Sequence, residues 1–278
     1  MINPNTVSLG TIQETLLITL WARAFEMNQI DPIMVDSGSA DILAKIDYDF
    51  QRFSQDKSSQ AIICIRNKAF DEIVKQFLQT YSLTSILEIG TGLNNRFERL
   101  DDGNLNWFDL DLPDTMAVRK RFFQESDRRR FISASVLETE WIDEVKSLSN
   151  SPMLFIAEGV LLYFSEQQVK RIFKTLAEHF PGSWILFDAT SPFLISIRRG
   201  FDAVKYTNAK YQWGIRNIQE IQAWDSRYQV HRSLYIPADF PQYLNRFPFI
   251  ERLMMYLFPR FQRMYGVHLI KLSDFNAQ

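Results

Sequence analysis

Ile86-Leu87-Glu88-Ile89-Gly90-Thr91-Gly92 is an apolar segment with the character of a strand, and it ends in a Gly-x-Gly turn. The backbone must turn sharply after such a strand and pass close to a flat, polar ligand, and glycine permits both. Asn95 stands where the dinucleotide pattern G-x-G-x-x-G has its third glycine. A pyrophosphate loop is therefore disfavoured. An ordinary tight strand-to-helix turn is the alternative interpretation.

An acidic pair, Asp109 and Asp111, ends the next apolar segment. Asp111 lies about 20 residues after the first glycine, where a second strand presents a carboxylate to a ribose. A glycine turn followed by a ribose-binding acid, without the third glycine, predicts S-adenosylmethionine as the cofactor.

Four segments in sequence order carry a resemblance to a known family. They are Arg66-Asn67-Lys68-Ala69-Phe70-Asp71, the stretch from Glu88 to Phe97, Trp107-Phe108-Asp109-Leu110-Asp111-Leu112-Pro113, and the stretch from Ile156 to Phe164. The chain resembles the leucine carboxyl methyltransferase family, in particular its bacterial branch, which includes the O-methyltransferase of tetracenomycin polyketide synthesis. The similarity runs from about Leu9 to Pro192 and fades beyond it. The resemblance implies a class I S-adenosylmethionine-dependent methyltransferase with a Rossmann-like fold.

The resemblance also implies roles for residues of the cofactor site. Arg66 matches the arginine that binds the carboxylate of the methionine part, which suits a planar guanidinium able to make charge-assisted contacts. Asp111 matches the acid on the ribose hydroxyls, and Glu158 matches the acid near the amino end of the methionine part. Arg66 as a surface arginine at a helix start, and Glu158 as a salt-bridged carboxylate away from ligand, are the alternatives.

Other positions of the site follow from the same resemblance. Gly90 and Gly92 let the main chain pass beside the methionine part, and Glu88 orients this turn. Ser135 and Val136 fall where other branches of the family place Asp-Leu to bind adenine. The sequence departs from that pattern, so the adenine contact is expected to be weaker or to come from the main chain.

Composition limits the possible functions. The chain has 278 residues, 46% hydrophobic content and a net charge of −2, which suits a packed core and gives no general attraction to nucleic acid or an anionic membrane. Cys64 is the single cysteine, so neither an intrachain disulfide nor a cysteine zinc site is expected. The sequence has no signal-peptide pattern and no long apolar span, so we expect a soluble, cytoplasmic protein that holds no metal.

Apolar spacing predicts alternating helices and strands from about residue 66 to residue 190, an α/β, doubly wound, mostly parallel sheet. Predicted helices cover 11–29, 70–81, 114–123 and 165–180, and predicted strands cover 85–89, 105–110, 131–134, 153–157, 184–188, 227–236 and 266–272. Residues 54–60 predict a loop, and Arg128-Arg129-Arg130 predict a solvated turn.

Three regions are expected along the chain. Residues 1–60 form an N-terminal helical segment of a lid, and residues 61–192 form the cofactor-binding core. Residues 193–278 contribute a helical insertion to the lid and then return as strands that complete the sheet.

Residues that touch the methyl acceptor are harder to assign from the sequence. Tyr163 lies shortly after Glu158 and is a candidate both for a general base and for acceptor binding. His231 is a second candidate base, although a lone histidine in a strand usually has a structural role. Tyr211 and Trp213 are candidates for an aromatic acceptor pocket within 198–230, with helix packing as the alternative.

The predicted function is O-methyl transfer from S-adenosylmethionine to a carboxylate or hydroxyl of a small molecule, such as a polyketide-like or other secondary metabolite. Methylation of a protein C-terminal carboxylate is the rival enzymatic function. A cofactor-binding protein without catalysis is the rival of another class.

Overall fold

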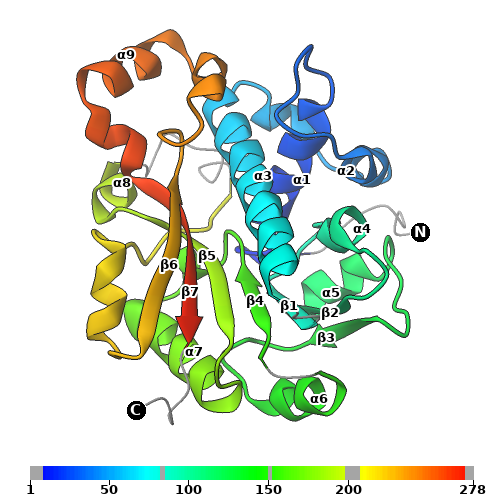
Figure 1. Ribbon diagram of the computed structural model, residues 1–278. Helices are drawn as coiled ribbons and strands as arrows, with labels where there is room; N and C mark the ends of the chain where they lie inside the picture. Colours follow the sequence, from blue (N-terminus) through cyan, green and yellow to red (C-terminus); the bar gives the residue numbers. More distant parts are fainter. Residues whose placement is uncertain (1–8, 82–84, 150–151, 198–206, 273–278) are drawn as a thin grey trace.

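Seven strands form one sheet in the order β3-β2-β1-β4-β5-β7-β6 (Figure 1). The computed structural model describes residues 9–81, 85–149, 152–197 and 207–272. The strands are β1 (Ser85–Ile89), β2 (Asn106–Asp111), β3 (Arg129–Ser133), β4 (Leu154–Ala157), β5 (Trp184–Thr190), β6 (Tyr228–Tyr235) and β7 (Tyr265–Leu272). The α-helices are α1 (Thr15–Glu26), α2 (Ser37–Leu43), α3 (Lys57–Thr80), α4 (Arg96–Leu100), α5 (Pro113–Arg119), α6 (Glu140–Leu148), α7 (Glu166–His179), α8 (Pro192–Ile197) and α9 (Phe249–Leu257). Short 3-10 helices are η1 (Phe50–Phe53), η2 (Leu161–Tyr163), η4 (Ile218–Ala223), η5 (Pro241–Arg246) and η6 (Pro259–Arg263).

The first five strands are parallel, and β7 runs against them. Strand β1 lies between β2 and β4, with Leu87 in register with Phe108 on one side and Phe155 on the other. Strand β7 pairs antiparallel with both β5 and β6. The predicted doubly wound, mostly parallel sheet, completed by strands that return late in the chain, is confirmed.

Both faces of the sheet are buried by helices. Ile86 and Leu154 pack with α1 and α3, whereas the residues that follow them, Leu87 and Phe155, pack with α6 and α7. Successive side chains of a strand point to opposite faces, so a strand covered on both sides needs apolar residues throughout. Burial of each such side chain stabilises the fold by about 1.5–3 kcal/mol.

Helix α3 is longer than the apolar spacing predicts, because a cap starts it early. The Asp56 carboxylate accepts a hydrogen bond from the backbone N–H of Ser59 at 2.9 Å, so the helix begins at Lys57. The predicted loop at 54–60 is therefore wrong over its second half. Helix α7 begins as predicted, because Ser165 and Gln168 form a reciprocal capping box.

Arg129 lies in a strand and is not part of the solvated turn that the sequence predicts. It begins β3, and its Nε is 2.7 Å from Asp109 Oδ2 in a buried ion pair. The sequence alone suggests a solvated turn for these three arginines, because the carboxylate that pairs with Arg129 belongs to Asp109 on another strand. Within the described ranges, no helix combines the length and the apolar character needed to cross a membrane.

Candidate functional site

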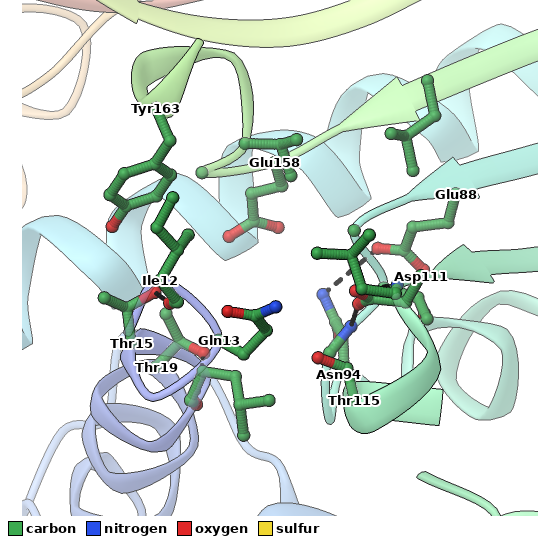
Figure 2. A pocket seen from close by; sticks show the side chains of 18 of the residues that line it. Ile12, Gln13, Thr15, Thr19, Glu88, Asn94, Asp111, Thr115, Glu158 and Tyr163 are labelled. Carbon is green, nitrogen blue, oxygen red and sulfur yellow. Dashed lines mark hydrogen bonds between the residues drawn. The ribbon is translucent and has the colours of Figure 1, made fainter. Parts of the chain in front are cut away.

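A cavity of about 260 Å³ lies at the carboxyl ends of β1, β2 and β4, with α1 on its opposite side. Figure 2 shows the side chains of Ile12, Thr15 and Thr19 on α1 and the preceding turn, facing Glu88 and Asp111 across this space. Ligands of open α/β sheets bind at this edge, where the strand order reverses. The cavity is therefore the candidate site.

The glycine turn forms the floor of the cavity. Gly90 and Gly92 have φ values of +64° and +52°, a backbone conformation that residues with a Cβ rarely adopt. A Cβ on Gly90 would lie 2.4 Å from a methyl group of Val160, and one on Gly92 would lie 3.4 Å from Leu16 Cβ. Both positions therefore need glycine for the turn, and Gly90 needs it for the close packing against Val160 as well.

Asp111 lies at the end of β2 and lines the cavity. Its two carboxylate oxygens accept hydrogen bonds from the backbone N–H groups of Gly92 and Leu112, each at 2.7 Å. Burial raises the pKa of Asp111 to about 6, against the opposing effect of these N–H groups. The carboxylate is held at the turn and is positioned to accept hydrogen bonds from a ligand.

Asp109, the other acid of the pair, is a structural residue. It is fully buried and pairs with Arg129 and with Arg119, whose Nη2 lies 3.1 Å from Oδ1. Thr91 and Trp107 also donate hydrogen bonds to it. Burial alone would raise the pKa of Asp109, but the two guanidinium groups outweigh it and lower that pKa.

Arg66 and Glu158 form an ion pair inside the cavity wall. Arg66 Nε is 2.8 Å from Glu158 Oε1, while Nη1 donates to the Tyr265 hydroxyl at 3.1 Å and lies 3.6 Å from Asp188 Oδ2. Burial acts to lower the pKa of Arg66, but Tyr265, Glu158 and Asp188 together raise it well above its usual value. Gly159 makes room for this guanidinium, because a Cβ there would lie 3.1 Å from Nη1.

Glu158 collects several donors. It accepts hydrogen bonds from Arg66, from Asn67 at 2.6 Å and from Arg96. Burial acts to raise the pKa of Glu158, but Arg66 and Arg96 hold it below its usual value. The sequence left open whether Glu158 forms a salt bridge or belongs to the ligand site. In the structure it does both, because it is salt-bridged and also lines the cavity.

Glu88 is more than an orienting group at the turn. Its Oε1 pairs with Arg96 and accepts a hydrogen bond from Asn94 at 3.4 Å, but its buried Oε2 has no hydrogen-bond partner among the described residues. Burial raises the pKa of Glu88 to about 7, and Arg96 opposes that rise only in part. An unpaired, buried acceptor in a cavity wall is costly unless a ligand donor meets it. No sequence pattern indicated that Glu88 would present an unpaired oxygen to a ligand.

Ser135 and Val136 follow β3 and line the cavity, and their predicted contact with adenine remains a prediction. The Ser135 hydroxyl accepts a hydrogen bond from the backbone N–H of Leu137 at 3.2 Å, and its own N–H donates to Glu138 at 3.0 Å. The turn that carries them is therefore held in one conformation.

The opposite half of the cavity is apolar and aromatic. Tyr163 points toward α1 (Figure 2), and its ring centroid lies 5.3 Å from that of Tyr211. Ile12 lies on this side as well (Figure 2), whereas Leu16 lines the cavity next to Gly92. Of the described residues in 193–278, Tyr211 alone lines the cavity. Residues 198–206 of the predicted acceptor region lie outside the described part.

Two predicted residues do not reach the cavity. Trp213 is buried in the core, with its ring centroid 6.1 Å from Trp224 and 6.3 Å from Phe187. The ring centroid of His231 lies 5.0 Å from that of Trp184 on the neighbouring part of the sheet. Helix and sheet packing, which the sequence left as the alternatives, accounts for both positions.

Helix α1 supplies cavity residues that the sequence did not identify as ligands. Arg23 fixes this helix, because its Nε pairs with Asp36 at 2.9 Å and its Nη2 donates to the carbonyl of Leu93 at 3.0 Å. Thr15 and Thr19 then face the cavity on successive turns. Their spacing of four residues is consistent with one helix face, but only the packing shows which face it is.

The strand order, the glycine turn and the acid at the end of β2 define a class I S-adenosylmethionine-dependent methyltransferase with a Rossmann-like fold. The sequence profile described as leucine carboxyl methyltransferase matches residues 17–177. The chain belongs to the leucine carboxyl methyltransferase family.

Two relatives agree with this assignment. The tetracenomycin polyketide synthesis O-methyltransferase TcmP of Streptomyces glaucescens is 32% identical, over 78% of this chain and 80% of the relative. The S-adenosyl-L-methionine-dependent methyltransferase dpfgK of Gibberella zeae is 27% identical, over 64% of this chain and 65% of the relative.

A solved structure shares the fold at low sequence identity. It is a Thermobifida fusca YX protein described as a candidate methyltransferase, with a TM-score of 0.56 and 13% identity over 91% of this chain and 94% of that chain. The match supports the architecture, and the family assignment comes from the sequence relatives.

Proposed function

We propose that this enzyme transfers the methyl group of S-adenosylmethionine to a carboxylate or hydroxyl oxygen of a small, largely apolar molecule. The apolar, aromatic half of the cavity carries this proposal. Ile12 and Tyr163 lie there, on the side of the cavity away from Asp111 (Figure 2), and Tyr211 packs beside Tyr163. Pockets for small molecules combine such an apolar lining with a few placed polar groups.

The residues present fit the cofactor. The turn at Gly90 is tight enough that a Cβ would clash with Val160, and both residues line the cavity. The unpaired oxygen of Glu88 and the carboxylate of Asp111 offer acceptors to an ammonium group and to ribose hydroxyls. We assign the carboxylate of the methionine part to Arg66 and the adenine to Ser135 and Val136, with Glu158 near the amino end.

Arg66 would bind that carboxylate through only part of its guanidinium group. Its Nε and Nη1 already donate to Glu158 and Tyr265, whereas Nη2 makes no hydrogen bond of this kind within the described ranges. We therefore assign one charge-assisted contact through Nη2 to this carboxylate.

The bound cofactor supplies a methyl group already activated on a sulfonium. The protein then needs to place the acceptor oxygen in line with that methyl group and to exclude water. Tyr163 is the remaining candidate for orienting or deprotonating an acceptor hydroxyl, because it borders the apolar half. A carboxylate acceptor would need no base.

The relative in Streptomyces glaucescens supports a metabolite as the acceptor, because its name places it in polyketide synthesis. The test separates metabolites from proteins. Purified enzyme and methyl-labelled S-adenosylmethionine are added to the metabolite and protein fractions of the same cell lysate, with the Asp111→Ala variant as the control. We expect label in the metabolite fraction with the unaltered enzyme only.

Label that appears only as a base-labile ester on one protein would contradict the proposal and favour a protein carboxyl methyltransferase. Cofactor binding without label in either fraction would favour a binding protein without catalysis.

A further inference from the structure

Helix α9 turns its apolar side chains away from the protein. Glu251 faces inward, where it accepts a hydrogen bond from the Ser58 hydroxyl at 2.6 Å, and Met255 packs against the core. Outward-facing side chains include Ile250, which is 74% exposed, and Tyr256, which is 80% exposed. Figure 1 shows α9 at the edge of the molecule, above α8. A surface helix normally places its apolar stripe on the core.

The exposed side chains of this helix form one continuous surface, which we call the α9 surface. Its members are Phe249, Ile250, Leu253, Met254, Tyr256 and Leu257 on α9, and Phe258, which directly follows the helix. At about 100° per residue the six members on the helix span an arc of about 160° around the helix axis. Glu251 and Arg252 lie at the two edges of this arc, so its interior carries no charge.

The size of the α9 surface is that of a protein interface. Scaling its exposed fractions by side-chain areas of about 150–250 Å² gives about 800 Å² of exposed apolar surface. A standard interface buries about 800 Å² on each partner. Soluble monomers rarely expose a continuous apolar patch of more than a few hundred Å².

The composition of α9 and of the segment that follows it also indicates an interface between proteins. Residues 249–264 contain four aromatic residues, three methionines and three arginines, with one glutamate and neither lysine nor aspartate. Interfaces between proteins are enriched in aromatic residues, methionine and arginine and depleted in lysine, glutamate and aspartate. A net charge of −2 gives an anionic bilayer no comparable attraction for the whole molecule.

We propose that the α9 surface is the interface of a homodimer, in which α9 of one copy packs on α9 of a second copy. A two-fold dimer places the same patch on both sides of the interface. An uncharged apolar arc meets this condition, because two copies of it can be apposed without burying a charge. Among the described residues that line the cavity, none belongs to 241–264, so dimerisation and cofactor binding are separable.

The test is the concentration dependence of the molar mass, measured by light scattering and sedimentation equilibrium. The unaltered protein should have the mass of two 32.7 kDa chains at micromolar concentration. Ile250→Glu should weaken dimerisation at least about 100-fold, because it places like charges against each other in an apolar interface. Ile30→Glu is the matched control, since Ile30 is fully exposed outside this surface and should leave the dimer intact.

Folding is checked by thermal melting and by S-adenosylhomocysteine binding, which both variants should retain. Tyr256→Glu is the second variant if Ile250→Glu does not fold. A protein that stays monomeric up to about 100 μM, above typical interface dissociation constants, would overturn the proposal. Equal dimerisation of Ile250→Glu and Ile30→Glu, or a monomer that floats with phosphatidylserine vesicles, would overturn it as well.

Discussion

Arg66 lies in the wall of the cavity, where it pairs with the carboxylates of Glu158 and Asp188. Arg66→Ala should weaken S-adenosylhomocysteine binding by about 1.5–3 kcal/mol, the contribution of a hydrogen bond to a charged group. The same change leaves Glu158 and Asp188 without their partner, so the free energy of unfolding should also fall. Arg66→Lys should recover part of the binding. Titration calorimetry and thermal melting measure the two effects.

Lys68→Ala is the matched control for Arg66, because Lys68 lies on the same helix in an exposed pair with Glu72 at 3.1 Å. It should change neither quantity by more than about 0.5 kcal/mol. Unchanged affinity in a folded Arg66→Ala protein would remove Arg66 from the site.

Asp111 predicts a pH dependence of cofactor binding. Its pKa in the ligand-free protein is raised to about 6, and ribose hydroxyls donate to the ionised carboxylate. Protonation therefore competes with binding, so affinity should be full above pH 6 and should fall up to about tenfold per pH unit below it. Calorimetry between pH 5 and pH 8 measures this fall, and Asp111→Asn should abolish it.

Glu88 titrates nearby, since burial raises its pKa to about 7. Repeating the series in Glu88→Gln isolates Asp111, because the fall near pH 6 should persist in that variant. A profile that is flat in Glu88→Gln but retained in Asp111→Asn would assign the dependence to Glu88.

At the scale of elements, the segment 207–217 places two neighbouring aromatic residues in different environments. Tyr211 faces the cavity beside Tyr163, while Trp213 is buried against Phe187 and Trp224. Tyr211→Ala should lower kcat/KM by about 10–100-fold with cofactor binding retained, the equivalent of losing one buried aromatic contact. Trp213→Ala should instead lower the free energy of unfolding by about 3–5 kcal/mol.

Steady-state kinetics and denaturant unfolding of the two variants measure this contrast. Each variant serves as the control for the other, since they lie two positions apart. A stable Trp213→Ala protein with normal cofactor binding and no turnover would restore Trp213 as an acceptor residue.

The whole molecule should respond to the cofactor through its stability. A ligand that binds only the folded state, at 100 times its dissociation constant, stabilises that state by about 2.7 kcal/mol. For a domain of this size we expect the melting temperature to rise by about 5 °C with S-adenosylhomocysteine. Scanning fluorimetry measures the shift, and NAD at the same concentration should give none. A shift with NAD alone would contradict the cofactor assignment.

The sequence alone predicted the strands in their order along the chain and the position of the glycine turn, but it did not predict several helices, among them α2, α6 and α9. Local rules are sufficient there, because Gly90 and Gly92 need positive φ values and β4 needs apolar residues on both faces. Asp111, Arg66, Glu158, Ser135 and Val136 were predicted from short motifs, and all five line one cavity. The roles assigned to them remain predictions.

Only the tertiary structure decided which side chains meet across the cavity. Trp213 and His231 carry the residue types of a substrate site, yet helix and sheet packing buries one and places the other against Trp184. Glu88 could not be assigned as a ligand group, because its unpaired oxygen depends on where Arg96 approaches it. Such facts arise from contacts between segments far apart in the chain, which no local pattern encodes.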